Sequence, residues 1–216
     1  FDLETDPQEM NNLYGKPEYT DLTNKLKNEL ESLREQYGDS DDNRFMPQPP
    51  IIIEHKALGK AVDYKYKYAK KYSAGGPTAL TNGRRGPDEI VFDGDYNVWQ
   101  GFEKNDLIAT VNLGEATAIN KIETGYLHNI QDWIFSPTEV QYQVSDDGRN
   151  YKTVAAIKND MDIKTNKSVR KAFAADIGGV EARYLRVIAK NVGICPQWHG
   201  GAGGSAWLFV DEIIVL

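Results

Sequence analysis

The chain has 216 residues, of which 40% are hydrophobic, and its formal net charge is −7 at pH 7. This length provides for one or two domains with a sizeable core, and no stretch approaches the roughly 18 apolar residues that a membrane helix needs. The negative charge argues against a nucleic-acid partner, because such proteins normally carry a dominant basic stripe. The chain begins at Phe1 without a signal-like segment, so we expect a mature or cut protein whose N-terminus does not identify its compartment.

Residues 1–42 are expected to form a helix flanked by turns. Pro17 suits the first helical turn, and Gly38 suits the position after the last one. Between them, apolar residues recur at spacings of three and four and predict one stripe on an amphipathic helix: Leu22, Leu26, Leu30, Leu33 and Tyr37. A single helix cannot bury its own stripe. We therefore expect it to pack on the downstream domain or on a domain upstream of this sequence.

An acidic run, GDSDDN, and clustered prolines, MPQPP, follow the helix and predict a linker over residues 43–50. From residue 51 to residue 216 the pattern changes to alternation with period two, in short segments separated by turn signals. The segment SDDGRN is typical of a hairpin turn in which Gly148 takes a positive φ. Short strands without intervening helical patterns favour a mainly β fold, either a sandwich or a barrel.

The densest basic stretch is KYKYAKKY, residues 65–72. We expect an amphipathic strand here, with tyrosines on one face and lysines on the other. Binding of an anionic ligand to this stretch is the alternative that the residues leave open.

The loop that precedes the last strand contains Cys195, Trp198, His199 and a run of glycines. Cys195 and His199 are four residues apart, but a structural zinc needs four ligands, and a nucleophilic cysteine needs a base and a residue that orients that base. We expect Cys195 to be a small buried thiol instead. The glycines precede a strand and lack a lysine, which argues against a phosphate loop. They favour a tight turn that brings aromatic residues close to a ligand or to the core.

Carboxylates form two kinds of pattern. Neighbouring residues on a strand point to opposite faces, so pairs such as Asp211 and Glu212 do not make a glycosidase centre. The turn Asp93-Gly94-Asp95 and the turn LTNG at residues 80–83 each place several oxygen atoms together, as calcium prefers. On residue type alone, each turn also fits a simple Asx turn.

Aromatic residues gather in three segments between strands, 97–102, 128–135 and 195–201. These segments combine Trp with His, Gln and Asn, which suits a carbohydrate site. A flat ring covers the apolar face of a sugar, and polar groups bind its hydroxyls. The alternative is that tryptophans fill the interior of the sandwich: Trp99, Trp133 and Trp207.

The segment FDLETDPQEMNNLYGKPEY resembles the C-terminal subdomain of bacterial sulfatases, in which a YDLxxDPxExxNLxxxPEY pattern leads into a last amphipathic helix. The resemblance covers roughly Phe1 to Tyr37. It implies a sulfatase catalytic domain upstream, which would carry a C/S-x-P-x-R motif that CPQWH does not match. The present chain is therefore expected to be non-catalytic.

Residues 51–216 resemble the discoidin or coagulation factor 5/8 C-type domain, also called family 32 carbohydrate-binding modules. The resemblance rests, in order, on ALTNGRRG, WQGF, DLIATVNLGEATAINKIETGYL, PTEVQYQVSDDGRNYKTV, ARYLRVIAKN and FVDEIIV. It implies a jelly-roll β-sandwich of the galactose-binding-domain-like type. The combination of ALTNGRRG and WQGF with CPQWHGGAGGSAWLFVDEI looks like domains appended to β-hexosaminidases and sulfatases of gut Bacteroidetes-type glycan degraders.

That resemblance implies two sites. A structural calcium is implied under the first loop, with Asn82 and Glu212 as ligands and Asp88, Asp93 or Asp95 as contributors. Asn82 is neutral where the family often has Asp, and one charge fewer weakens calcium binding. Sugar binding is implied in loops at one end of the sandwich, where the candidate residues are His128, Trp133, Trp198, His199, Trp99, Gln100 and Arg170.

Together the two resemblances predict a non-catalytic carbohydrate-binding module at the C-terminus of a secreted, periplasmic or cell-surface sulfatase that acts on glycans. The expected partners are a glycan containing galactose or N-acetylhexosamine and the upstream catalytic domain. Neither a nucleic acid nor a membrane span is expected. The alternative is a structural domain that docks on the sulfatase core and stabilises it or shapes its active site. Enzyme activity of the chain itself ranks last.

Overall fold

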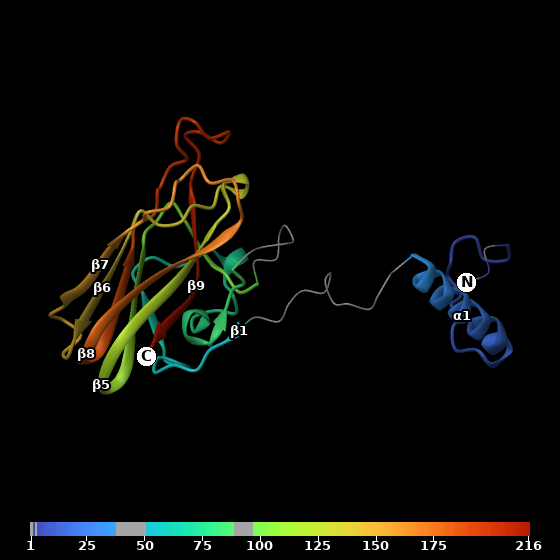
Figure 1. Cartoon of the computed structure of the whole chain (residues 1–216), viewed down its shortest axis with the longest axis horizontal. Helices are drawn as coiled ribbons and strands as arrows, with labels where there is room; N and C mark the ends of the chain where they lie inside the picture. The colour runs from blue at the N-terminus through green and yellow to red at the C-terminus, as the bar shows by residue number, and fades with distance from the viewer. Residues whose placement is uncertain (1, 3, 38–50, 89–96) are drawn as a thin grey trace. The chain divides into compact units, whose positions relative to one another are not determined.

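The structure is a computed structural model, which describes residues 2, 4–37, 51–88 and 97–216. The chain divides into two compact units, Phe1–Pro47 and Gln48–Leu216 (Figure 1). The predicted linker 43–50 lies outside the described residues, so the predicted division into residues 1–42, 43–50 and 51–216 stays a prediction.

The N-terminal unit contains the predicted amphipathic helix. The 3-10 turn η1 (Pro17–Tyr19) has its proline in the first turn and leads directly into α1 (Thr20–Tyr37). The apolar stripe of α1 is exposed: Leu22, Leu26, Leu30, Leu33 and Tyr37. Several of these leucines line an apolar hollow of about 680 Å³ together with Tyr14 and Tyr19. Within the described ranges, no helix is long and apolar enough to cross a membrane.

The C-terminal unit is built from antiparallel strands. Within its described residues, a two-stranded sheet pairs β1 (Ile51–Ile52) with β3 (Arg84–Arg85). A seven-stranded sheet has the order β4-β9-β5-β8-β6-β7, with β2 paired to β5 beside this path. Its strands are β2 (Val62–Tyr64), β4 (Gln100–Glu103), β5 (Leu107–His128), β6 (Glu139–Ser145), β7 (Lys152–Lys158), β8 (Val169–Ala189) and β9 (Trp207–Val215). The connecting loops contain the 3-10 turns η3 (Lys70–Tyr72), η4 (Ala79–Thr81) and η5 (Ile130–Asp132).

Two long strands, β5 and β8, fold this sheet into two layers. They pair along their length, from Leu107 with Ala189 to His128 with Val169. A straight strand of this length would extend about 70 Å, which is far beyond the size of a small domain. The ribbon bends instead where the register shifts: one shift contains Gly114 (φ 98°) of β5, and the other contains Gly178 and Gly179 of β8, opposite Asn120. As a result, the C-terminal half of β5 also pairs with β9, and the C-terminal half of β8 also pairs with β6.

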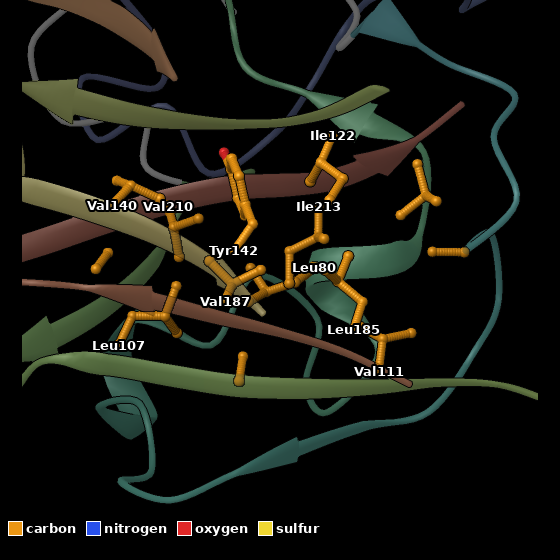
Figure 2. Close-up of a cluster of buried hydrophobic side chains, with 14 of the residues drawn as sticks. Leu80, Leu107, Val111, Ile122, Val140, Tyr142, Leu185, Val187, Val210 and Ile213 are labelled. Carbon is orange, nitrogen blue, oxygen red and sulfur yellow. The ribbon is translucent and has the colours of Figure 1, made fainter. Parts of the chain in front are cut away.

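The hydrophobic core lies between these layers (Figure 2). Inward positions alternate along β5, where Leu107, Ala109 and Val111 are fully buried, as the period-two pattern predicts. They pack with side chains from β6, β8, β9 and η4: Val140, Tyr142, Leu185, Val187, Val210, Ile213 and Leu80. The predicted mainly β sandwich, preceded by an amphipathic helix, is confirmed.

The hairpin of β6 and β7 is also confirmed. Gly148 at its turn has a φ of 71°, and Asp147 Oδ1 accepts the backbone N–H groups of Asn150 and Arg149 and the Ser145 hydroxyl. These donors stabilise the carboxylate and hold the pKa of Asp147 well below its usual value. The turn is therefore built around a charged Asp side chain.

The predicted strand over residues 65–72 is wrong. The chain leaves the sheet after Tyr64, and it then forms η3. The physical reason is that the tyrosines anchor this segment individually. Tyr68 packs edge-on against Phe102, and Tyr72 packs against the aromatic residues at the start of β9.

Candidate functional site

Three loops of the C-terminal unit contact one another at one end of the sandwich, from which the loop before β9 projects (Figure 1, orange to red). They are residues 129–136 after β5, residues 159–168 before β8 and residues 190–206 before β9. Gln131 Nε2 donates to Asn166 Oδ1 at 3.2 Å and links the first loop to the second. Further ring contacts link the first loop to the third. Two of the three aromatic segments singled out in the sequence are thus brought together.

Trp133 is held in a backbone conformation that exposes its ring. Its φ is 63°, in the left-handed region that bulky residues rarely adopt. Hydrogen bonds secure the backbone on both sides, because its N–H donates to the Ile130 carbonyl and its carbonyl accepts from Trp207 N–H. The ring lies over Gly201 and Gly204, where an added Cβ would approach it to 2.5 and 2.7 Å. The glycines therefore provide a flat seat, and 41% of Trp133 stays exposed.

His199 braces the third loop against the first. Its Nδ1 accepts from Gly201 N–H at 3.0 Å, so its Nε2 carries the proton and donates to the Ile130 carbonyl at 2.6 Å. The ring lies 6.3 Å from that of Trp133. Because both ring nitrogens form hydrogen bonds with the backbone, His199 positions Trp133 rather than contacting a ligand directly.

His128 plays the same role for the second loop. Its Nδ1 accepts from Ser136 N–H at 3.3 Å, and its Nε2 donates to the Thr165 carbonyl at 3.1 Å. Burial lowers the pKa of His128, which favours the neutral form that this hydrogen-bond pattern requires. The residue is only 1% exposed. We therefore replace the sugar contact expected of His128 with a structural role.

Trp198 forms a second exposed aromatic surface at the same end. It is 41% exposed, and its ring lies 5.8 Å from His199 and 6.4 Å from Phe135. Lys164 Nζ lies 5.7 Å from the centroid of the Trp198 ring. In the same loop Cys195 is buried, and burial raises the pKa of its thiol. The expectation of a small buried thiol is confirmed.

A hollow of about 320 Å³ lies beside Trp133. Its lining comes from η3, the loop after β5 and the start of β9: Lys71, Tyr72, Gln131, Asp132, Trp133, Ile134, Trp207 and Phe209. An aromatic wall with a few polar groups is typical of small-ligand sites. Lys71 and Tyr72 were not among the residues expected at the site. Their sequence gives no clear signal, because the spacing of four between Tyr64, Tyr68 and Tyr72 places the rings on one face of a strand as well as of a helix.

Three further residues expected to bind sugar lie in the interior. Trp99 and Gln100 are fully buried, and Arg170 is 7% exposed. Gln100 Nε2 donates to the backbone carbonyls of Ser73 and Gly76 and holds the loop before η4. A buried side chain does not reach a ligand on the surface, so we correct these three assignments to structural roles.

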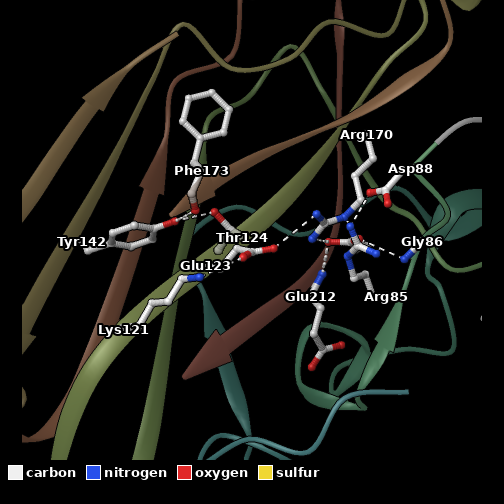
Figure 3. Close-up of polar contacts among 11 residues, drawn as sticks. Arg85, Gly86, Asp88, Lys121, Glu123, Thr124, Tyr142, Arg170, Phe173 and Glu212 are labelled. Atoms are coloured by element: carbon white, nitrogen blue, oxygen red, sulfur yellow. Dashed lines mark hydrogen bonds and ion pairs between the residues drawn. The ribbon is translucent and has the colours of Figure 1, made fainter. Parts of the chain in front are cut away.

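Arg170 is the centre of a buried ion network (Figure 3). Its Nε donates to Asp211 Oδ2 at 2.6 Å, and its Nη1 donates to Glu123 Oε1 at 3.3 Å. Gly86 N–H donates to the same Asp211 oxygen at 2.9 Å, and the backbone N–H of Arg170 donates to the Asp88 carbonyl. Burial by itself lowers the pKa of Arg170, but the two carboxylates hold it above its usual value. The network ties β5, β8 and β9 to the segment after β3.

The two main calcium ligands implied by the resemblance lie close together. Gly83 N–H, next to Asn82, donates to Glu212 Oε1 at 3.1 Å. The Glu212 side chain is fully buried, and the same Oε1 lies 3.0 Å from His55 Nε2. Its Oε2 is buried without a hydrogen-bond partner in the described part of the chain. Burial raises the pKa of Glu212, as it does for a carboxylate that lacks enough compensating partners.

The other implied ligands add less. Asn82 Oδ1 accepts from Arg84 N–H at 2.8 Å, and the Asp88 side chain is paired with Arg85. Asp93 and Asp95 lie outside the described residues. Among the residues that are described, no three His, Cys, Asp or Glu side chains form a group suited to a metal ion. Of the buried side-chain atoms that lack a hydrogen-bond partner in the described residues, Glu212 Oε2 is the carboxylate oxygen.

Comparisons with known proteins give two matches by family. A model of the F5/8 type C domain matches residues 73–210, and a model of the C-terminal region of N-sulphoglucosamine sulphohydrolase matches residues 1–36. None of the curated proteins matches the chain.

Several solved structures are similar. The chitosan-binding module 1 of a chitosanase/glucanase from Paenibacillus sp. IK-5 has 15% identity and a TM-score of 0.47, covering 76% of this chain and 99% of that one. CpGH89CBM32-5 from Clostridium perfringens, in complex with GalNAc-β-1,3-galactose, has 18% identity and a TM-score of 0.44. The match covers 72% of this chain and 93% of that one. A fucose-binding module from Streptococcus pneumoniae has 13% identity and a TM-score of 0.46, covering 76% and 98%.

Proposed function

The chain belongs to the F5/8 type C domain family, and from this premise we propose that its β-sandwich is a non-catalytic carbohydrate-binding module. The observation that carries the proposal is the exposed ring of Trp133, seated on Gly201 and Gly204 at the edge of the hollow. A rigid aromatic surface binds the apolar face of a sugar ring. Gln131 and Lys71 lie around the same hollow and supply polar groups for its hydroxyls.

The proposed ligand is a glycan that contains galactose or N-acetylhexosamine. A shallow site with one main stacking surface favours weak monovalent binding, which suits a module that keeps an attached enzyme near a polymer. A non-catalytic role is supported by the burial of Cys195 and by the engagement of both ring nitrogens of His199 and of His128. No nucleic-acid partner is proposed, in keeping with the net charge of −7.

We propose further that the N-terminal unit is the tail of a sulfatase. The family match over residues 1–36 and the exposed apolar stripe of α1 support this proposal, because the stripe needs a surface to cover it. The upstream catalytic domain is the proposed partner of that stripe. A secreted, periplasmic or cell-surface location follows from the proposed role on glycans.

Replacing Trp133 by Ala should weaken glycan binding at least tenfold, about 1.4 kcal/mol, since aromatic residues dominate such contacts. The measurement is calorimetric titration with galactose- and N-acetylhexosamine-containing oligosaccharides, after a glycan array has identified binders. Because Trp133 is 41% exposed, the variant should stay folded. Unchanged affinity of a folded Trp133→Ala protein, or no binding of the parent chain to any glycan, contradicts the proposal.

Two glycine variants provide a matched pair for the same test. Gly201→Ala places a methyl group 2.5 Å from the Trp133 ring and should displace it, so binding should fall as in Trp133→Ala. Gly200→Ala meets no atom within 4 Å and should bind as the parent does. In the alternative, a structural domain that docks on the sulfatase core, these changes would lower the stability of the full-length enzyme and leave glycan affinity unaffected.

We also propose that the module holds a structural calcium ion, with Glu212 and Asn82 among its ligands. The buried Glu212 Oε2 without a partner supports this, because a bound cation would satisfy it. Millimolar calcium should raise the midpoint of thermal unfolding and EDTA should lower it, since a ligand at 100 times its Kd adds about 2.7 kcal/mol. The Glu212→Gln variant should lose this response, and equal midpoints of the parent in calcium and EDTA would contradict the site.

A further inference from the structure

Lys71 places a cation at the hollow that forms no ion pair with a carboxylate of the described residues. Its side chain is exposed, and its Nζ lies 4.7 Å from the ring centroid of Tyr72 and 5.0 Å from that of Trp207. In the described part of the chain, no Asp or Glu oxygen lies within 4.0 Å of this nitrogen. The two rings fix the position of the ammonium group through cation–π contacts. The hollow thus has a positive charge at a defined position.

A second lysine, Lys164, lies beside the second exposed tryptophan, Trp198. Lys164 Nζ lies 5.7 Å from the ring centroid of Trp198, and its side chain is exposed. Among the described residues it also has no carboxylate within ion-pair distance. Its backbone is fixed, because its N–H donates to Asp162 Oδ1 at 3.0 Å. Each exposed tryptophan of this end therefore has a lysine beside it that forms no ion pair within the described part of the chain.

The two exposed tryptophans pack against the same histidine ring. The Trp133 ring lies 6.3 Å from the ring of His199, and the Trp198 ring lies 5.8 Å from the same imidazole. His199 is locked between them by its two backbone hydrogen bonds. A ligand that contacts both tryptophans must therefore be longer than one sugar ring.

From this arrangement we propose that the loop end binds an anionic oligosaccharide, with sugar rings on Trp133 and Trp198 and sulfate or carboxylate groups paired with Lys71 and Lys164. The inference rests on the proposed carbohydrate-binding function and specifies the chemistry of its ligand. It also gives a role to a lysine of the basic segment 65–72, whose tyrosines pack on the sandwich.

Screening by salt explains how a protein with a negative net charge binds an anionic ligand. The net charge of −7 repels an anion at long range, but the Debye length is about 8 Å at physiological ionic strength, so distant charges are screened. Contact pairs are screened much less. Asp132 lines the same hollow and accepts from Asn129 Nδ2 at 2.8 Å. Its carboxylate disfavours an anionic group on that side of the hollow and so directs such a group towards Lys71.

The test compares four probes on the full chain: heparin-derived oligosaccharides, their desulfated form, their carboxyl-reduced form, and neutral galactose- and N-acetylhexosamine-containing oligosaccharides. We expect the anionic probes to bind at least tenfold more tightly than the neutral ones. Lys71→Gln and Lys164→Gln should each weaken anion binding three- to tenfold and should weaken neutral binding less, because glutamine keeps a hydrogen-bond donor for hydroxyls and lacks the charge. The dependence of log Kd on log salt should lose a slope of about one for each lysine removed.

Lys65→Gln and Lys67→Gln are the matched controls, because these exposed lysines come from the same basic segment and do not line the hollow. They should leave all four affinities unchanged. Equal losses in these controls would mean non-specific attraction and would overturn the inference. Equal binding of neutral and anionic probes would overturn it and leave the proposed function intact, whereas no binding of any probe would overturn both. Preference for the desulfated or for the carboxyl-reduced form identifies carboxylate or sulfate as the recognised group, and either result supports the inference.

Discussion

Replacing Arg170 by Ala is expected to lower the free energy of unfolding of the C-terminal unit by about 3–5 kcal/mol. The side chains of Arg170 and Asp211 are fully buried, and Glu123 completes the ion network. Removing the guanidinium leaves Asp211 charged, buried and without its cation. Such an uncompensated charge costs more than the ion pair contributes, because the folded protein cannot replace the water that the carboxylate has lost.

Urea unfolding followed by tryptophan fluorescence reports on the C-terminal unit, since all four tryptophans lie beyond residue 97. Lys171→Ala is the matched control, because Lys171 is the next residue in β8 and forms an exposed pair with Asp160. Its cost should be at most about 1 kcal/mol. Combining Arg170→Met with Asp211→Asn should recover part of the loss, because the uncompensated charge is then absent. A cost below about 1 kcal/mol for Arg170→Ala would contradict this account.

The second large effect is expected for Trp99→Ala, which should cost about 3–5 kcal/mol of unfolding free energy. Trp99 is fully buried and packs in a small cluster with Leu127, Ile134 and Phe209. Its ring lies so close to Gly86 that an added Cβ there would approach it to 2.4 Å. Truncation therefore leaves a cavity that the rigid surroundings cannot fill. The measurement is again urea unfolding, for which three tryptophans remain as probes.

This prediction separates two roles for tryptophan in one molecule. Under conditions where Trp99→Ala is folded, its glycan affinity should equal that of the parent chain, whereas Trp133→Ala should lose affinity and keep most of its stability. The opposite result would be a folded Trp99→Ala protein with unchanged unfolding free energy and a tenfold weaker affinity. That result would show that Trp99 belongs to the binding surface.

Much of the architecture is readable from the sequence because it rests on local periodicity. The stripe from Leu22 to Tyr37 has the spacing of one helix face, and α1 follows it. The alternation in residues 107–113 places every second side chain in the core, as a strand between two layers requires. Gly148 marks a turn because glycine takes positive φ without strain. Each of these inferences needs only neighbours along the chain.

The membership of the site depends on contacts that are distant in sequence. Trp99 and Trp133 both belong to segments with polar residues between predicted strands, but one ring is buried against Phe209 and the other is exposed over Gly201. Lys71 reaches the hollow because Tyr72 packs on the start of β9, more than 130 residues later. Periodicity carries no information on such pairings.

The sequence by itself determined the class of fold, the helix, the hairpin and the fact that aromatic loops lie between strands, because each follows from the period of burial or from backbone preference. Only the tertiary structure decided which aromatic rings remain exposed and which charges are paired. Arg170 and Lys71 illustrate the difference: both are cations, yet the bend of β5 and β8 buries one against Asp211, and the packing of η3 leaves the other at the surface. Burial and pairing are properties of surfaces brought together by folding, and they are set when distant segments meet.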